Sequence, residues 1–469
     1  MKSSSRIQVE RRDPTRFARG QLSRRDCLRL ALGGLAGTTL AHFLPASAAA
    51  QVANRPAEAQ SASNAKAPTA RSVIQIWQWG GAAHLDTFDP KPEAGQAYCG
   101  PFSKPVATKV DGIRLCELLP LLAKQADKFS LIRSLTHGSN AHETAAYMVQ
   151  TGRPDGGRLV YPGLGAVTSL FKGYGTGYRG LIPPYVVLTK PQGRFSESGF
   201  LGSKHKPFAT GGDPAKTPFL VEGIVSEGMT EESQRARQQL LGELNTWAAL
   251  AKDSDAVQAH QRAEAEAYDL ILGDGAKVFD LSQESTEVRE RYGRNTFGQS
   301  CLMARRLVES GVPYITINYD GWDTHKQHFQ AMRRKLPEFD KGLSSLLQDL
   351  GERGLLQSTI VWCVGEFGRT PKVQWEAPWD GGRGHYGKVF SALLAGGGFQ
   401  GGRVVGASNK TGEEVAERPV APQDLFASIC ERLGIDLQAK LPHPQGLDVR
   451  VGPGGEDGAS PPRPLLELL

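Results

Sequence analysis

Carboxylate and imidazole side chains recur in short polar clusters, each placed beside an apolar run of the sequence. The first cluster follows the apolar run 74–79 and contains His84, Asp86 and Asp89. Later clusters add more side chains of the same two kinds: His137, His142, Glu143, Asp323, His325, Glu366 and His385. These clusters hold five of the ten histidines of the chain. Imidazole and carboxylate groups together are typical ligands of divalent metals, so the sequence predicts a metal or anion site.

The elements that must position these groups are short β-type runs separated by helical patterns. The run 74–79 is rich in β-branched and aromatic residues and ends at Gly80-Gly81, where the chain can turn. Similar runs occur near 129–132, 184–188, 314–319, 359–364 and 389–395, with amphipathic helices predicted between them. Such alternation predicts an α/β fold with a mainly parallel central sheet and helices on both faces. The segment 231–272 is predicted to be a helical insertion, because it has few breakers and no β-branched runs.

Parallel strands present their carboxyl ends at one edge of a sheet, where ligands bind in folds of this class. We therefore expect six side chains to converge on one metal site: Asp86, His142, Asp323, His325, Glu366 and His385. His84 is a further candidate ligand if the loop after the first strand stays extended. Mixed imidazole and carboxylate ligation favours Zn or Mn, with Ca or Mg as alternatives.

Each of these residues also has a purely structural interpretation. His84 could cap its own loop through a backbone hydrogen bond. Glu366 and Arg369 could form a structural ion pair. His137 could be a surface residue or one that only supports a ligand. The recurrence of the same chemistry after several strands favours the site.

The N-terminal region has the three-part layout of a bacterial export signal. Residues 1–29 hold nine Lys or Arg residues against three acidic ones, which accounts for the net charge of +6. Arg24-Arg25 precedes an apolar segment, 30–44, and a run of small residues. This pattern indicates a twin-arginine signal peptide over 1–50; a single membrane anchor is the alternative. The nearly neutral remainder gives no electrostatic reason to expect nucleic-acid binding.

The domain organisation follows from these patterns. Residues 51–70 are predicted to be a disordered linker because they lack core-forming side chains. Residues 71–445 are predicted to form the folded α/β domain, and 446–469 a C-terminal tail. The expected destination is the periplasm or the exterior, reached through the twin-arginine export machinery, with no stable membrane span after signal cleavage.

Several stretches together resemble a bacterial family called domain of unknown function 1501. They are 80–92, Tyr292-Gly293, 322–325 and 365–371, and the resemblance covers about residues 70–440. That family is placed among alkaline-phosphatase-like and sulfatase-like folds, and its members commonly carry twin-arginine signals. The resemblance therefore implies an alkaline-phosphatase-like domain with one or two metal ions beside a nucleophile.

The resemblance also implies roles for individual residues. In sulfatases and nucleotide phosphodiesterases the nucleophile often lies ten residues before the glycine of a Thr-Gly pair. Here that pair is Thr151-Gly152, and the position ten residues back holds His142. His142 is thus a candidate ligand or nucleophile, and Thr144 or Ser139 is a candidate displaced nucleophile.

Other positions resemble the metal-binding and anion-binding parts of the superfamily. His385 resembles its last metal-binding histidine, and Arg369 or Arg153 is expected to hold the anion. Glu366-Phe367-Gly368 lies where an Asp-His-Gly motif is usual, and phenylalanine cannot bind metal.

Two functions follow as hypotheses. The first is an exported metal-dependent hydrolase of phosphate or sulfate esters with a non-standard catalytic set, acting on anionic small molecules or polysaccharides. The second is a non-catalytic extracytoplasmic binding or assembly protein that keeps the fold. No P-loop, GxSxG or CxxCH motif indicates another chemistry.

Overall fold

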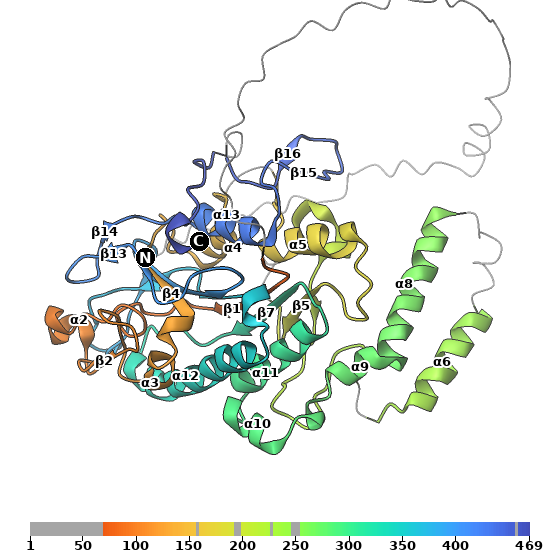
Figure 1. Ribbon diagram of the computed structural model, residues 1–469, viewed down its shortest axis with the longest axis horizontal. Coiled ribbons are helices and arrows are strands. Elements are labelled where there is room, and N and C mark those ends of the chain that lie inside the picture. The colour runs from red at the N-terminus through yellow and green to blue at the C-terminus, as the bar shows by residue number, and fades with distance from the viewer. Residues whose placement is uncertain (1–68, 156–158, 192–197, 226–227, 245–253, 455–457) are drawn as a thin grey trace, which may run out of the picture. The chain divides into compact units, whose positions relative to one another are not determined.

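The computed structural model describes residues 69–155, 159–191, 198–225, 228–244, 254–454 and 458–469 (Figure 1). The predicted signal peptide and all but the last two residues of the predicted linker lie outside the described residues. Among the described residues, no helix combines the length and the apolar character that crossing a bilayer requires.

An eight-stranded sheet forms the centre of the fold. Its strands, in spatial order, are β12 (Val404–Val405), β4 (Phe129–Leu135), β11 (Phe390–Gly396), β8 (Thr359–Val364), β1 (Ser72–Gln78), β7 (Tyr314–Tyr319), β5 (Tyr185–Leu188) and β6 (Phe208–Ala209). Seven strands run in one direction, and β11 runs antiparallel to both its neighbours, β4 and β8. The prediction of a mainly parallel α/β sheet is confirmed.

The inner strands β1, β8 and β11 are buried on both faces, which explains their largely apolar sequences. Successive side chains of a strand point to opposite faces. In β1, Ile74 and Ile76 belong to one core cluster, whereas Val73 and Trp77 belong to the other. The sheet therefore separates two hydrophobic cores.

Helices cover both faces, as the sequence predicts (Figure 1). One core is closed by α3 (Pro120–Ala123), α10 (Thr286–Tyr292), α11 (Thr296–Glu309) and α12 (His328–Glu352). The other is closed by α4 (His142–Thr151), α5 (Leu164–Thr168) and α13 (Pro422–Leu433). The carboxylate of Asp340 in α12 accepts hydrogen bonds from the backbone N–H groups of Leu121 and Leu122, so it caps the start of α3.

The segment 231–272 contains α6 (Glu231–Leu244) and α8 (Asp255–Leu272), followed by α9 (Asp274–Val278), and its described residues contribute no strand. Smaller elements complete the domain: α2 (Gln96–Cys99), β2 (Val106–Ala107), β3 (Arg114–Leu115), β9 (Gly368–Arg369), β10 (His385–Tyr386), β13 (Ala407–Ser408), β14 (Val415–Glu417), β15 (Lys440–Leu441) and β16 (Val449–Arg450).

The C-terminal residues are part of the folded domain, although the sequence suggests a separate tail from 446 onward. β16 pairs with β15, which lies before that boundary. Val451, Leu465 and Leu468 are fully buried in the core that α13 covers. The many Gly and Pro residues of this segment conceal the few apolar side chains that anchor it.

Candidate metal-binding site

Five of the six side chains that the sequence places at one site meet at the carboxyl edge of the sheet. Asp323 and His325 follow β7, Glu366 follows β8, and His142 begins α4 after β4. His385 instead lies in the short strand β10, just before β11 of the central sheet. Because β11 runs antiparallel to β8 and β4, its amino end lies where their carboxyl ends lie.

The centre of the cluster is one carboxylate oxygen, Oδ1 of Asp323. It lies 3.0 Å from Nε2 of His325 and 3.0 Å from Nε2 of His385. The two Nε2 atoms are 2.9 Å apart. Ligands about 2.1 Å from one ion lie about 3.0 Å apart on an octahedron and about 3.4 Å apart on a tetrahedron. The three atoms thus have the mutual spacing of neighbouring ligands around a single ion.

The outer nitrogen of His385 fixes the tautomer of its ring. Nδ1 lies 2.9 Å from the carbonyl oxygen of Asn140, which can only accept a hydrogen bond, so Nδ1 carries a proton. In a neutral ring, the Nε2 lone pair then faces a carboxylate oxygen. Two acceptors at 3.0 Å require a cation or a proton between them. Metal-bound histidines characteristically donate their other ring N–H in this way.

His142 follows the same pattern. Its Nδ1 lies 2.6 Å from Oε1 of Glu366, and its Nε2 lies 3.5 Å from Oδ2 of Asp323. Ligand atoms of His142, Asp323 and His385 all lie within 4.8 Å of one another. Asp323 and Glu366 together raise the pKa of His142 to about 9, and the contact with Glu366 is the shorter one.

Glu366 is fully buried, and only one of its carboxylate oxygens is occupied. Oε1 accepts hydrogen bonds from the backbone N–H of Gly80 at 2.9 Å and from His142. Oε2 is buried and has no hydrogen-bond partner among the described residues. An orphaned oxygen on a buried carboxylate that contacts the His142 imidazole fits a cation site. The residues present therefore suit a divalent ion.

Arg369 is the positive charge already built into the cluster. Its Nη1 donates to Oδ1 of Asp323 at 2.7 Å and to the carbonyl of Gly80 at 3.1 Å, and its Nη2 donates to the carbonyl of Arg383. Partial burial would raise the pKa of Asp323, but His142 and Arg369 hold it well below its usual range. Arg369 thus keeps Asp323 ionised, and the predicted role in holding a substrate anion stays a prediction.

Asp86 does not join the cluster. Its two carboxylate oxygens contact Nε and Nη2 of Arg383 at 2.7 and 3.1 Å, and Oδ2 also contacts Nε2 of His328 at 2.8 Å. Both oxygens of Asp86 therefore have partners within this fully buried network. Since the carbonyl of Arg383 accepts from Arg369, Asp86 supports the site indirectly.

His84 also lies outside the cluster, with its Nε2 2.9 Å from the carbonyl oxygen of Gly412. The prediction that it shares a direction with Asp86 assumed an extended loop. The loop instead coils into turns, in which the N–H groups of Thr87 and Asp89 both donate to the carbonyl of His84. The alternation of side chains therefore fails here. The ring of His84 does contact a backbone carbonyl, but in the distant loop that contains Gly412 and not in its own loop.

Thr144 points away from His142. Residues two apart on a helix are about 200° apart around its axis. The hydroxyl of Thr144 donates to Asp155 at 2.9 Å. The Ser139 hydroxyl accepts the backbone N–H of Ala141. Within the described residues, no hydroxyl or thiol contacts the His142–Asp323–His385 group, so its nucleophile candidate is His142.

Aromatic rings close the cluster on its inner side, and sequence reasoning did not assign them this role. The Phe367 ring packs against His142 and His385, with centroid distances of 5.0 and 4.6 Å. Trp79 stacks on His142 at 5.4 Å. These rings give the cluster an apolar wall beside His142 and His385, whereas the side chains of Asp323 and His325 are more than a third exposed. His328, the first residue of α12, was also missed; its Nδ1 contacts the hydroxyl of Thr324, four residues earlier in the sequence.

Comparisons with solved structures find alkaline-phosphatase-like and sulfatase-like proteins at low similarity. The lipoteichoic acid synthase LtaP from Listeria monocytogenes is 9% identical over 83% of this chain and 75% of its own, with a TM-score of 0.36. The alkaline phosphatase from the Antarctic bacterium TAB5 is 10% identical over 78% of this chain and 99% of its own, with a TM-score of 0.34. The PsFucS1 sulfatase from Pseudoalteromonas sp. is 12% identical over 84% and 74%, with a TM-score of 0.34.

A search of curated protein sequences finds no significant match. A family profile matches residues 70–457, which is most of the chain and all eight strands of the sheet. The chain belongs to the family described as Protein of unknown function (DUF1501).

Proposed function

We propose that this protein is an exported, metal-dependent hydrolase of phosphate or sulfate esters. The observation that carries the proposal is the convergence of Nε2 of His325 and Nε2 of His385 on Oδ1 of Asp323, at 2.9 to 3.0 Å. These three atoms would hold a divalent ion, for which Zn or Mn is favoured by the mixed ligands. A bound ion would polarise the ester oxygen and stabilise the charge that develops on it.

His142 would act on a substrate bound beside that ion. Glu366 accepts a hydrogen bond from Nδ1–H and fixes the ring, so that Nε2 lies toward Asp323. An imidazole oriented by a carboxylate can serve as a base or as a nucleophile when it is neutral. Asp323 and Glu366 raise the pKa of His142, and a divalent ion bound beside the ring would oppose that effect and favour the neutral form. We infer that His142 takes the part that a hydroxyl or thiol plays in related enzymes.

The alternative function is binding or assembly without turnover. It is favoured by one observation, the orientation of Thr144 toward Asp155 instead of toward the cluster. This alternative retains the metal site and lacks only a reacting group.

A substrate panel separates the two functions. The mature protein is assayed on aryl phosphates, phosphodiesters and aryl sulfates, each with added Zn, Mn, Mg or Ca. Turnover that is lost in His142→Ala and retained in His443→Ala, a histidine of the C-terminal region, supports the hydrolase. Metal binding without turnover on any of these esters supports the alternative.

Export by the twin-arginine route is the second part of the proposal, and it rests on Arg24-Arg25 and the apolar segment after them. The expected site of action is the periplasm or the exterior, on anionic small molecules or polysaccharide esters. Replacing both arginines with lysines should leave precursor in the cytoplasm. Undiminished export of that variant would contradict the assignment.

A further inference from the structure

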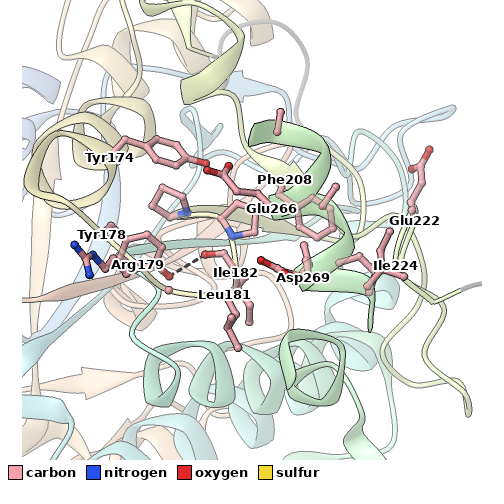
Figure 2. A pocket seen from close by; sticks show the side chains of 18 residues that line it. Tyr174, Tyr178, Arg179, Leu181, Ile182, Phe208, Glu222, Ile224, Glu266 and Asp269 are labelled. Carbon is pink, nitrogen blue, oxygen red and sulfur yellow. Dashed lines mark hydrogen bonds between the residues drawn. The ribbon is translucent and has the colours of Figure 1, made fainter. Parts of the chain in front are cut away.

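A cavity of about 620 Å³ lies between α8 and the segment 174–184, which leads into β5 (Figure 2). It is at the amino end of β5, whereas the candidate metal site follows the carboxyl ends of β7 and β8. The two sites therefore lie at opposite edges of the sheet. Cavities of this size commonly take a small organic molecule.

The walls of this cavity are largely apolar and aromatic. Figure 2 shows the rings of Tyr174, Tyr178 and Phe208 around its interior. Ile182 and Leu270 also line the cavity. The hydroxyl of Tyr178 donates to the carbonyl of Ile182 at 2.8 Å, which fixes the position of that ring. Such a lining favours a ligand with an apolar body.

The charges on the lining are mostly negative. Glu222, Glu266 and Asp269 contribute carboxylates, against one guanidinium, that of Arg179. None of the three carboxylates forms an ion pair with another described residue. Glu266 adds to the effect of burial in raising the pKa of Tyr174, which places its charge close to that ring.

α8 supplies two of the lining carboxylates, those of Glu266 and Asp269. Ala263, Glu266, Ala267 and Leu270 follow the spacing of one helical face, and all four line the cavity. The small alanine side chains leave room between the helix and the tyrosines. Carboxylates beside aromatic faces form the environment that attracts an organic cation.

We propose that this cavity binds a small organic cation, namely an ammonium group carried on an apolar body. The carboxylates of Glu266 and Asp269 face the ammonium, and the tyrosine, proline and phenylalanine rings surround the body. This proposal is independent of the hydrolase proposal, because it uses no residue of the metal cluster.

Three probes that share one body test the charge preference. Binding of 4-phenylbutylamine, 4-phenylbutanol and 4-phenylbutyrate to the full protein is measured by calorimetry at low and at high salt. We expect the amine to bind at least tenfold more tightly than the alcohol, and the butyrate to bind weakest. High salt should weaken the binding of the amine and of neither other probe, because salt screens the attraction between exposed charges. Equal affinity for amine and butyrate, or no binding of the amine, would overturn the proposal.

Variants of α8 test the place of binding. The double variant Glu266→Gln with Asp269→Asn should weaken binding of the amine about tenfold and leave binding of the alcohol unchanged. Glu264→Gln is the matched control, because Glu264 lies on the same helix but does not line the cavity. Ala267→Trp should fill the cavity and abolish binding of both, with folding checked by circular dichroism. An equal effect of Glu264→Gln, or undiminished binding in Ala267→Trp, would contradict the site.

Discussion

Nδ1 of His142 lies 2.6 Å from Oε1 of Glu366, and this contact joins the first turn of α4 to the end of β8. The same oxygen of Glu366 accepts the backbone N–H of Gly80, after β1. Three segments far apart in the sequence are therefore fixed at one carboxylate. Glu366 orients the imidazole that we propose to react.

Glu366→Gln should lower activity and metal affinity by about 10–100-fold, the range found when the partner of a metal-site histidine is removed. The amide keeps the size of the side chain but loses the charge that raises the pKa of His142. The measurement is kcat and KM on the best ester of the panel, together with metal titration. Glu143→Gln, at the exposed neighbour of His142, is the control and should leave both unchanged. Equal behaviour of the two variants would contradict the role of Glu366.

Asp86→Ala should destabilise the fold by about 3–5 kcal/mol, because it leaves the buried Arg383 without its carboxylate. Urea unfolding followed by tryptophan fluorescence measures the free energy of unfolding. Asp127→Ala removes an exposed pair with Lys109 and should cost at most about 1 kcal/mol. A loss for Asp86→Ala as small as that of the control would show that the buried network contributes little.

Asp340 gives a pH-dependent contribution to stability. Burial raises its pKa to about 6 from an ordinary value of 3.8, against the opposing effect of the N–H groups of Leu121 and Leu122. Between about pH 4 and pH 6 the folded protein retains a proton that the unfolded chain loses.

The contribution is thus complete below about pH 4 and is lost as the pH rises through about 6, a change of about 3 kcal/mol. The measurement is the free energy of unfolding of the protein and of Asp340→Asn, compared from pH 4 to pH 7. The difference between them should shrink toward higher pH or reverse. A difference that stays constant with pH would contradict the raised pKa.

The fold could be predicted well because local sequence patterns indicate both buried strands and amphipathic helices. The predicted strand 314–319 coincides with β7, and α11 is one of the amphipathic helices expected between the strands. The direction of β11 could not be predicted, because an antiparallel central strand has the same apolar sequence as a parallel one. His385 nevertheless reaches the site, since the reversed strand begins at the edge where its neighbours end.

The composition of the site was predictable where a residue directly flanks a strand, as for Asp323 and Glu366. It was not predictable for Asp86 and His84, because the turns between Ala83 and Asp89 redirect both side chains. The partner of Asp86, His328, is 242 residues away in the sequence, and no local pattern joins them. Thr144 is not a nucleophile candidate in the structure, because a residue two positions after His142 lies on the opposite side of α4.

The most direct test of the account is anomalous diffraction from crystals of the mature protein grown with Mn or Zn. We predict an anomalous peak within about 2.3 Å of Oδ1 of Asp323, Nε2 of His325 and Nε2 of His385. The peak should vanish in Asp323→Asn and persist in His443→Ala. An ion held by other residues, or no ion at this cluster at saturating metal, would contradict the proposed metal site.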